Sequence, residues 1–250
     1  MVSSPIIIFS LFISFFPNLN AYKSDVLFIG PSHVTQLSSN PRIFLYKKFL
    51  TKDESDHIIS LAKGKLKRST VLNGKSGVIS STRTSSSVFL SKNQDEIITK
   101  IEHRIAAWTF LPIENGEPMQ VLRYENGQKY DPHYDAFRNE DNIKLWGNRI
   151  ATVLLYLSNV GKGGETIFPH SQAKHSQKKD NESWSECAMD GYSVKAVKGD
   201  ALLFFNLHLN KSIDMKSFHG SCPVIHGNKW TATKWINTIS FDNILQKKNA

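Results

Sequence analysis

The segment at residues 150–157 constrains the fold most, because all but one of its residues are apolar. An apolar run of this length is typical of a β-strand that is buried on both faces. The Asn126-Gly127 pair predicts a hairpin turn between a strand that ends near residue 124 and the segment that follows it. Segments of strand character are spread along the chain at residues 42–46, 80–90, 119–124, 163–168, 193–197, 200–205 and 230–238.

Two helices are expected ahead of most of these strands. Thr51 and Glu54 have the spacing of a capping box, which predicts the start of the first helix. The second is expected at about residues 93–108, where apolar side chains recur at helical spacing (Ile97, Ile98, Ile101, Ile105 and Trp108). Helices followed by many short strands predict an α+β fold, with the helices packed against a β-sandwich or jelly roll.

The N-terminal segment predicts entry into the secretory pathway. Residues 5–16 are mostly apolar but form a run shorter than the ~20 residues that a spanning helix needs. Residues 1–21 are therefore interpreted as a signal peptide, with an uncleaved signal anchor as the alternative. A polar linker is expected at 22–40 and one folded domain at 41–245, located in the endoplasmic reticulum or the Golgi.

The cysteines and sequons agree with an oxidising compartment. Cys187 and Cys222 are the only cysteines, and two cysteines in one secreted domain usually form a disulfide. Two buried free thiols are the alternative. Asn181 and Asn210 begin Asn-x-Ser sequons and are candidate glycosylation sites. The long polar segment at 170–190 is interpreted as a mobile surface loop.

The formal net charge of +9 does not by itself indicate a nucleic-acid partner. The lysines are scattered along the chain, without an arginine-rich helix or the spacing of a zinc finger. The charge is therefore interpreted as a solvated face that disfavours cationic substrates, and no nucleic-acid partner is expected.

Three residues have the chemistry of a metal site. In an extended segment, His133 and Asp135 lie on the same face. His219 offers a second imidazole, and two histidines with one carboxylate can hold Fe(II) while they leave positions open for substrate and O2. A His-x-Asp tripeptide alone also occurs by chance on polar loops, so the prediction depends on the later histidine.

A lysine follows at the start of the last strand. Strand alternation places Lys229, Thr231, Thr233 and Trp235 on one face and Lys234 on the other. Most lysines lie at the surface, but a lysine that points into a barrel interior needs an anion, for which a dicarboxylate is a natural candidate. Lys234, on the opposite face, is expected to tolerate alanine.

Four motifs together resemble the prolyl 4-hydroxylases, particularly the short plant type. They are Tyr124 with residues 131–135, the Gly-Gly-Glu-Thr-Ile-Phe-Pro segment at 163–169, residues 198–205 and residues 219–235. The resemblance covers about residues 42–241. It implies a double-stranded β-helix (jelly-roll) core, with Fe(II), 2-oxoglutarate, O2 and L-ascorbate, and hydroxylation of peptidyl proline in the secretory lumen.

The resemblance also implies roles for individual residues. His133, Asp135 and His219 would bind iron, and Lys229 would bind the distal carboxylate of 2-oxoglutarate. The remaining roles fall on residues that match the family's cofactor pocket and substrate channel: Tyr124, Thr166 and Trp235 for the cofactor, Arg83, Ser85, Glu117 and Tyr130 for the peptide, and Arg149 as a catalytic residue. The expected partner is a proline-rich polypeptide in the polyproline II conformation.

Two other functions remain open at the level of sequence. A lysyl hydroxylase or a small-molecule dioxygenase would keep the iron ligands but need not keep the segment at 83–86 together with Tyr130. A non-enzymatic β-sandwich binding module would need neither the two histidines nor an inward lysine. Extensin-like, arabinogalactan-like and collagen-like substrates are not distinguished.

Overall fold

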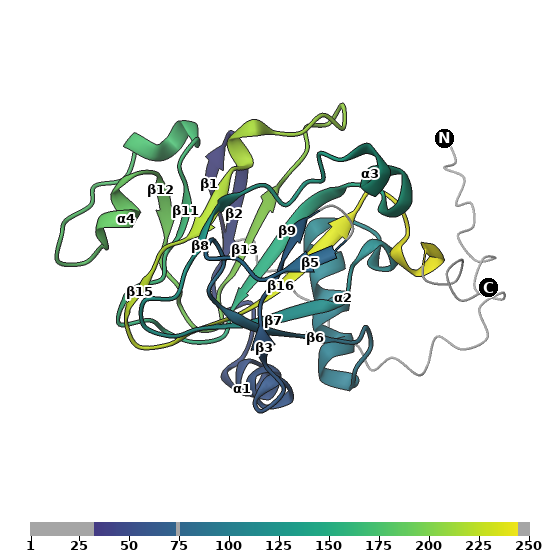
Figure 1. Cartoon of the computed structure of the whole chain (residues 1–250), viewed down its shortest axis with the longest axis horizontal. Coiled ribbons are helices and arrows are strands. Elements are labelled where there is room, and N and C mark those ends of the chain that lie inside the picture. Colours follow the sequence, from purple (N-terminus) through teal and green to yellow (C-terminus); the bar gives the residue numbers. More distant parts are fainter. Residues whose placement is uncertain (1–32, 74–75, 245–250) are drawn as a thin grey trace, which may run out of the picture.

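Two facing antiparallel sheets form the core of the computed structural model, which describes residues 33–73 and 76–244 (Figure 1). The large sheet has the order β1 (Val34–Ser39), β2 (Arg42–Tyr46), β13 (Ala201–Phe205), β9 (Arg149–Tyr156), β16 (Lys229–Asn237), β7 (Met119–Tyr124), β6 (Ser86–Leu90) and β3 (Lys67–Arg68). The small sheet has the order β12 (Tyr192–Val194), β11 (Thr166–Phe168), β14 (His219–Ser221) and β8 (Tyr130–His133). This arrangement confirms the predicted jelly roll.

Shorter elements complete the fold. Two further strand pairs are β10 (Lys162–Gly163) with β15 (Val224–His226), and β4 (Val71–Asn73) with β5 (Ser76–Val78). The helices are α1 (Lys52–Ala62), α2 (Glu96–Thr109), α3 (Glu140–Trp146) and α4 (Glu186–Met189), with 3-10 turns η2 (Ile113–Asn115), η3 (Gln172–His175) and η4 (Met215–Ser217). Within the described ranges no helix has the length and apolar character to cross a membrane. The proposed targeting segment at 1–21 lies outside them.

The central strand β9 separates two environments. Ala151, Val153 and Leu155 pack with α1 and α2 in the larger apolar core. On the other face, Thr152 and Leu154 line a cavity between the two sheets. The alternation of a strand thus gives one sheet a face covered by helices and a face that can carry a functional site.

Helix α1 begins at its predicted cap, and both helices pack as predicted, although α2 begins three residues later than the predicted start near residue 93. The side chain of Thr51 accepts a hydrogen bond from the Glu54 backbone, and the Glu54 side chain accepts one from the Thr51 backbone, which confirms the capping box. Helix α2 begins after Asp95, whose carboxylate caps it. Four of the five apolar residues predicted for its core face are buried, and the fifth, Ile97, is partly buried against the same core.

The folded domain begins earlier than the sequence predicts. Residues 34–39, assigned to the linker at 22–40, form β1 and pair with β2 at the edge of the large sheet. Val34 and Leu37 pack on the two apolar cores, whereas the polar residues between them are largely exposed. A short polar edge strand lacks the apolar run that would identify it in a sequence.

Two predicted connections differ in the structure. Gln128 donates to the carbonyl of Glu125, so the turn at Asn126-Gly127 exists, but β7 and β8 on either side of it belong to different sheets. The strand predicted at 80–90 is limited to β6, because residues 80–85 leave the large sheet and Arg83 bridges to Tyr130 of the small one. At both places the chain passes between the large sheet and the small one.

The polar segment at 170–190 is folded and is not a bare loop. It contains η3 and α4, and Ser171, Ser185 and Ala188 are buried within it. Cys187 in α4 forms a disulfide with Cys222, which follows β14, so the predicted bond is present. The polar side chains are accommodated because they cap short helices and pair with one another.

The disulfide should contribute to stability. Because the bond closes a sequence separation of 35 residues, the restricted unfolded chain predicts that Cys187→Ser with Cys222→Ser lowers the free energy of unfolding by roughly 2–4 kcal/mol. Denaturant titration of oxidised protein and of the double variant measures this difference. Labelling of two free thiols in denatured, unreduced protein would show that the bond is absent in solution.

Lys234 points away from the cavity as predicted, but it is buried in an ion pair, which argues against the expectation that it tolerates alanine. Its side chain is 3 % exposed and its ammonium forms an ion pair with Glu102 of α2, whose side chain is fully buried. Burial lowers the pKa of Lys234, and the carboxylate of Glu102 opposes this effect. Helix α2 covers this face, so no solvated lysine can lie there.

Lys234→Ala is therefore expected to leave a buried carboxylate without its partner and to lower the free energy of unfolding by about 3–5 kcal/mol. Denaturant titration measures the change. The double variant Lys234→Met with Glu102→Leu removes both charges and should recover most of the loss. Wild-type stability in the single variant would contradict the burial of this pair.

Candidate active site

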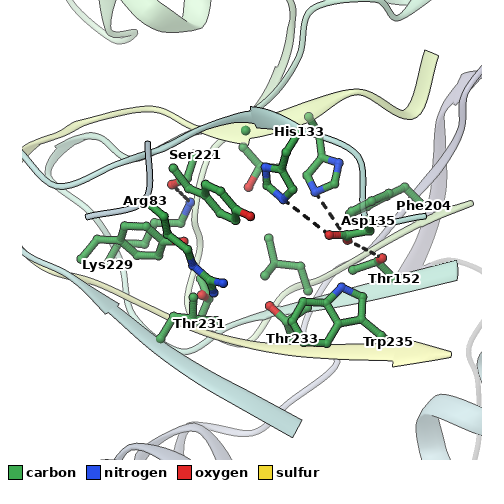
Figure 2. Close-up of a pocket in the computed structure, with 17 residues that line it drawn as sticks. Arg83, His133, Asp135, Thr152, Phe204, Ser221, Lys229, Thr231, Thr233 and Trp235 are labelled. Carbon is green, nitrogen blue, oxygen red and sulfur yellow. Dashed lines mark hydrogen bonds and ion pairs between the residues drawn. The ribbon is translucent and has the colours of Figure 1, made fainter. Parts of the chain in front are cut away.

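Three potential metal ligands converge at one end of the cavity between the sheets. His133 at the end of β8 and His219 at the start of β14 are paired residues of the small sheet. Asp135 follows β8, and the ligand atoms of the three residues all lie within 4.8 Å of one another (Figure 2). The structure therefore brings together the three residues that the sequence predicts as metal ligands.

Hydrogen bonds fix the orientation of both imidazoles. His133 Nδ1 lies 2.9 Å from the carbonyl of Asp131, and His219 Nδ1 lies 2.8 Å from the carbonyl of Ser217. A carbonyl can only accept, so each Nδ1 carries the proton and each Nε2 presents a lone pair. The Nε2 atoms lie 3.4 and 3.5 Å from the carboxylate oxygens of Asp135.

The electrostatics of the cluster favour a cation. Burial lowers the pKa of His219 to about 4, which leaves this imidazole neutral at neutral pH. Burial alone would raise the pKa of Asp135, but His219, His133 and Arg149 outweigh it and hold that pKa well below its usual range. An ionised carboxylate with histidine nitrogens is the donor set of a non-haem Fe(II) site, so these residues fit the metal.

Lys229 lies at the other end of the same cavity. Its side chain is 1 % exposed, and Nζ donates to the hydroxyl of Ser221 at 2.8 Å. Burial lowers the pKa of Lys229 to about 7, although the carboxylate of Glu165 acts in the opposite direction. A buried ammonium with only a hydroxyl in hydrogen-bond contact is suited to an anionic ligand.

The cavity that joins the two ends has a volume of about 50 Å³ and opens to solvent. Figure 2 shows Lys229 and Ser221 on one side and the potential metal ligands His133 and Asp135 on the other. Tyr124, Thr166 and Trp235, assigned to the cofactor, all contribute to its lining, together with Thr231 and Thr233. A cavity with a potential cation site at one end and a buried ammonium at the other suits a ligand with a carboxylate at each extremity.

Arg83 and Tyr130 connect this cavity to a wider groove. Both residues line both spaces. The guanidinium of Arg83 lies 4.7 Å from the centroid of the Tyr130 ring, which stacks on His133 at 3.7 Å. Burial raises the pKa of Tyr130 to about 12, so its hydroxyl stays protonated at neutral pH. These two side chains can therefore meet a substrate that reaches the metal from the groove.

Arg149 and Trp235 form part of the groove wall. The guanidinium of Arg149 lies 3.8 Å from the centroid of the Trp235 ring, and both residues contribute to the groove lining. Trp235 Nε1 is a buried donor without a hydrogen-bond partner among the described residues. An unpartnered donor beside the potential metal ligands is available to a bound ligand.

Two residues predicted to contact the peptide lie outside the lining of both spaces. Ser85 is fully buried and donates to Ser69 Oγ at 2.9 Å. Both carboxylate oxygens of Glu117 accept from Arg149, at 2.7 and 2.9 Å. Their contacts with neighbouring side chains are already formed, so they hold the site rather than face the groove. The sequons Asn181 and Asn210 are exposed and lie away from both spaces.

Sequence reasoning missed two residues that form hydrogen bonds with the candidate site residues Asp135 and Lys229. Thr152 donates to Asp135, and Ser221 accepts from Lys229. Thr152 is the one polar residue of the apolar run 150–157, and this exception is the signal that could have identified it. Ser221 carries no comparable signal, because its contact depends on how β14 and β16 meet in space.

Three comparisons agree with this geometry. Residues 119–237 match the model of the 2OG-Fe(II) oxygenase superfamily. The chain is 59% identical over 221 residues to "Probable prolyl 4-hydroxylase 7" of Arabidopsis thaliana, covering 88% of this chain and 70% of that one. It is 55% identical to "Prolyl 4-hydroxylase 2" of the same plant, covering 87% and 74%.

A solved structure has a similar fold. The viral collagen prolyl hydroxylase from Paramecium Bursaria Chlorella virus-1, in its 2OG complex, has a TM-score of 0.60 and 25% sequence identity. The match covers 79% of this chain and 96% of that chain.

The lowered pKa of Lys229 predicts how 2-oxoglutarate binding depends on pH. If Lys229 binds the distal carboxylate, the ligand needs the charged ammonium, which is present below pH 7 and is lost as pH rises through about 7. We expect the dissociation constant of 2-oxoglutarate to be constant below this pH and to rise above it. Because Lys229 must then take up a proton when the ligand binds, the rise should approach about tenfold per pH unit. Anaerobic titration calorimetry of Mn(II)-loaded protein, in buffers of different ionisation enthalpy, measures the constant and counts the proton.

Two variants control this measurement. Lys229→Arg keeps its charge across the range, so its binding should be weaker than wild type but independent of pH. Lys229→Ala leaves the ligand carboxylate unpaired, and breaking such a pair costs about 3–5 kcal/mol, or roughly two to four decades of affinity. Equal affinity of the wild type at pH 6 and pH 9, without proton uptake, would contradict the assignment.

Proposed function

This chain belongs to the prolyl 4-hydroxylase family, and we propose that it hydroxylates carbon 4 of proline residues in proline-rich proteins of the secretory pathway. The observation that carries the proposal is one cavity with three potential metal ligands at one end and a buried lysine at the other, with a groove beside the ligands. Fe(II) and 2-oxoglutarate are the cofactors of the superfamily. The cavity has a place for each.

The chain's own residues bind and orient the reactants. His133, Asp135 and His219 would hold the metal, and Lys229 with Ser221 would hold the distal carboxylate of 2-oxoglutarate. Bound iron supplies the activation of O2, so that one oxygen atom enters succinate as 2-oxoglutarate loses CO2 and the other enters the proline ring. The apolar side chains around the cavity limit access of water to this reaction.

The groove supports a polypeptide substrate. Aromatic rings line it beside the metal, as in grooves that recognise polyproline II segments, whose backbone is already extended before binding. The aromatic residues that line it are Phe89, Tyr130, Tyr134, Phe137 and Trp235. Arg83 stacks over Tyr130 and would place the peptide so that a proline ring lies above the metal.

The proposed location is the endoplasmic reticulum or the Golgi, with residues 1–21 as a signal peptide or a single-pass anchor. The apolar run at 5–16, the disulfide between Cys187 and Cys222, and the exposed sequons at Asn181 and Asn210 support it. We also propose L-ascorbate as the reductant that keeps the iron in the ferrous state. Extraction of membranes from cells that produce the chain, with glycosidase treatment, tests the location.

Mass spectrometry tests the activity directly. Incubation of the purified chain with Fe(II), 2-oxoglutarate, O2 and proline-rich peptides should add the mass of one oxygen atom to proline, and amino-acid analysis should identify 4-hydroxyproline. His219→Ala should lose this activity, because two remaining ligands bind Fe(II) poorly. Circular dichroism checks that the variant folds.

The other outcomes are equally decisive. Oxygen found on lysine, or turnover only with a small molecule, would assign the site to another class of dioxygenase. Near-normal activity in His219→Ala would move the metal ligand to a different histidine. No metal-dependent consumption of 2-oxoglutarate would favour a binding module.

A further inference from the structure

Two buried hydrogen bonds connect the potential metal ligand Asp135 to residues of the large sheet. Thr152 Oγ1 lies 2.7 Å from Asp135 Oδ2 and 2.9 Å from Asn206 Nδ2 (Figure 2 shows the first contact). Thr152 and Asn206 are 1 % and 0 % exposed, and Asp135 is buried as well. All three polar groups are therefore removed from water and are joined by these two hydrogen bonds.

The direction of the hydrogen bonds follows from the chemistry of the groups. The carboxylate of Asp135 can only accept, so the single hydroxyl hydrogen of Thr152 points toward it. The oxygen of Thr152 then accepts from the amide NH2 of Asn206. The opposite amide orientation would place two oxygens face to face without a hydrogen between them. Asn206 thus fixes the hydroxyl in the donating direction.

The backbone holds Asn206 in this place. Its backbone N–H donates to the backbone carbonyl of Ile150 in β9, and its backbone carbonyl accepts from the backbone N–H of Asp214. These bonds attach the residue after β13 to the strand that carries Thr152. The backbone that carries the Asn206 side-chain amide is therefore fixed by hydrogen bonds to neighbouring segments.

The chain of donors distinguishes the two oxygens of Asp135. Each oxygen lies near one histidine, with Oδ1 3.4 Å from His133 Nε2 and Oδ2 3.5 Å from His219 Nε2. Oδ2 also accepts the hydrogen bond of Thr152, so one of its lone pairs is already occupied. A carboxylate that bound a metal through both oxygens would occupy one position more than a carboxylate that binds through one. A metal held by these three residues would need its other positions open for the reactants, so each protein ligand should occupy only one position.

We propose that Thr152 and Asn206 are positioning residues that orient Asp135 and leave Oδ1 as its metal-binding oxygen. This role rests on the proposed function for its purpose, but it can be measured without turnover. Removal of a group that orients a metal ligand lowers metal affinity by about 10- to 100-fold. The hydroxyl, rather than the bulk of Thr152, is the group that acts.

Metal binding by the purified full-length chain tests the proposal. Co(II) is titrated into metal-free protein under anaerobic conditions, and its visible absorption reports both affinity and ligand arrangement. Thr152→Val, which keeps the side-chain shape, should bind Co(II) about 10- to 100-fold more weakly, with a changed spectrum. Thr152→Ser keeps the hydroxyl and should remain within a few-fold of the wild type.

Thr109→Val is the matched control. Thr109 is a buried threonine in α2 whose hydroxyl donates to the carbonyl of Ile105, away from the cavity. Loss of this hydroxyl should lower stability and leave the Co(II) affinity unchanged. Wild-type Co(II) affinity and spectrum in folded Thr152→Val would overturn the proposal.

Asn206→Leu provides a second route. Thr152 stays in place but is free to rotate its hydroxyl, so a smaller, several-fold loss of Co(II) affinity is expected. Added to Thr152→Val, the same change should cause no further loss, because Asn206 acts only through Thr152. Additive losses would refute the chain of contacts, and failure of both single variants to fold would make the role structural and also refute it.

The test is separate from the proposed function. Peptide hydroxylation can fail while the Co(II) affinities follow the expected order, which would leave the positioning role intact and remove only its purpose. Conversely, active enzyme with unaltered Co(II) binding in Thr152→Val would keep the function and remove the positioning role.

Discussion

The buried carboxylate of Asp135 is the interaction on which the rest of the site depends. A negative charge between two sheets is unfavourable unless partners surround it. His133 and His219 approach from the small sheet, and Thr152 approaches from the large one. Side chains of both sheets therefore stabilise this one buried charge.

Two lysines of one strand show how burial can serve either stability or binding. Lys234 and Lys229 lie on opposite faces of β16 and are both buried. Lys234 has a permanent partner in Glu102 of α2. Lys229 forms no ion pair within the described part of the chain and donates to Ser221. The difference makes one lysine part of the core and leaves the other available to a ligand.

Sequence patterns predicted residues that are close together along the chain. The period of two placed Lys229 and Trp235 of β16 on the face that lines the cavity, and His133 with Asp135 also line it, although Asp135 lies just after β8. The same patterns did not assign strands to sheets, so the turn at Asn126-Gly127 was interpreted as a hairpin although it crosses between sheets. Pairing between distant strands depends on packing of the whole domain, which local periodicity does not contain.

The resemblance to a family had a similar limit for Ser85 and Glu117. It placed both residues in the neighbourhood of the substrate channel, but hydrogen bonds to Ser69 and Arg149 turn them away from the groove. A motif records which residues a site requires. Whether a side chain contacts the ligand or holds one that does is decided by side-chain contacts in three dimensions.

The segment at 170–190 extends this reasoning to the cosubstrate end of the cavity. Ser185 donates to both carboxylate oxygens of Glu165 through its backbone and its hydroxyl, and the amide of Cys222 donates to the carbonyl of Glu165. The disulfide joins Cys222 to the same segment through Cys187. Thr166 and Ser221, which line the cavity, are the immediate neighbours of these anchored residues. A polar segment that resembles a loop in sequence therefore braces the strands that carry the cosubstrate site.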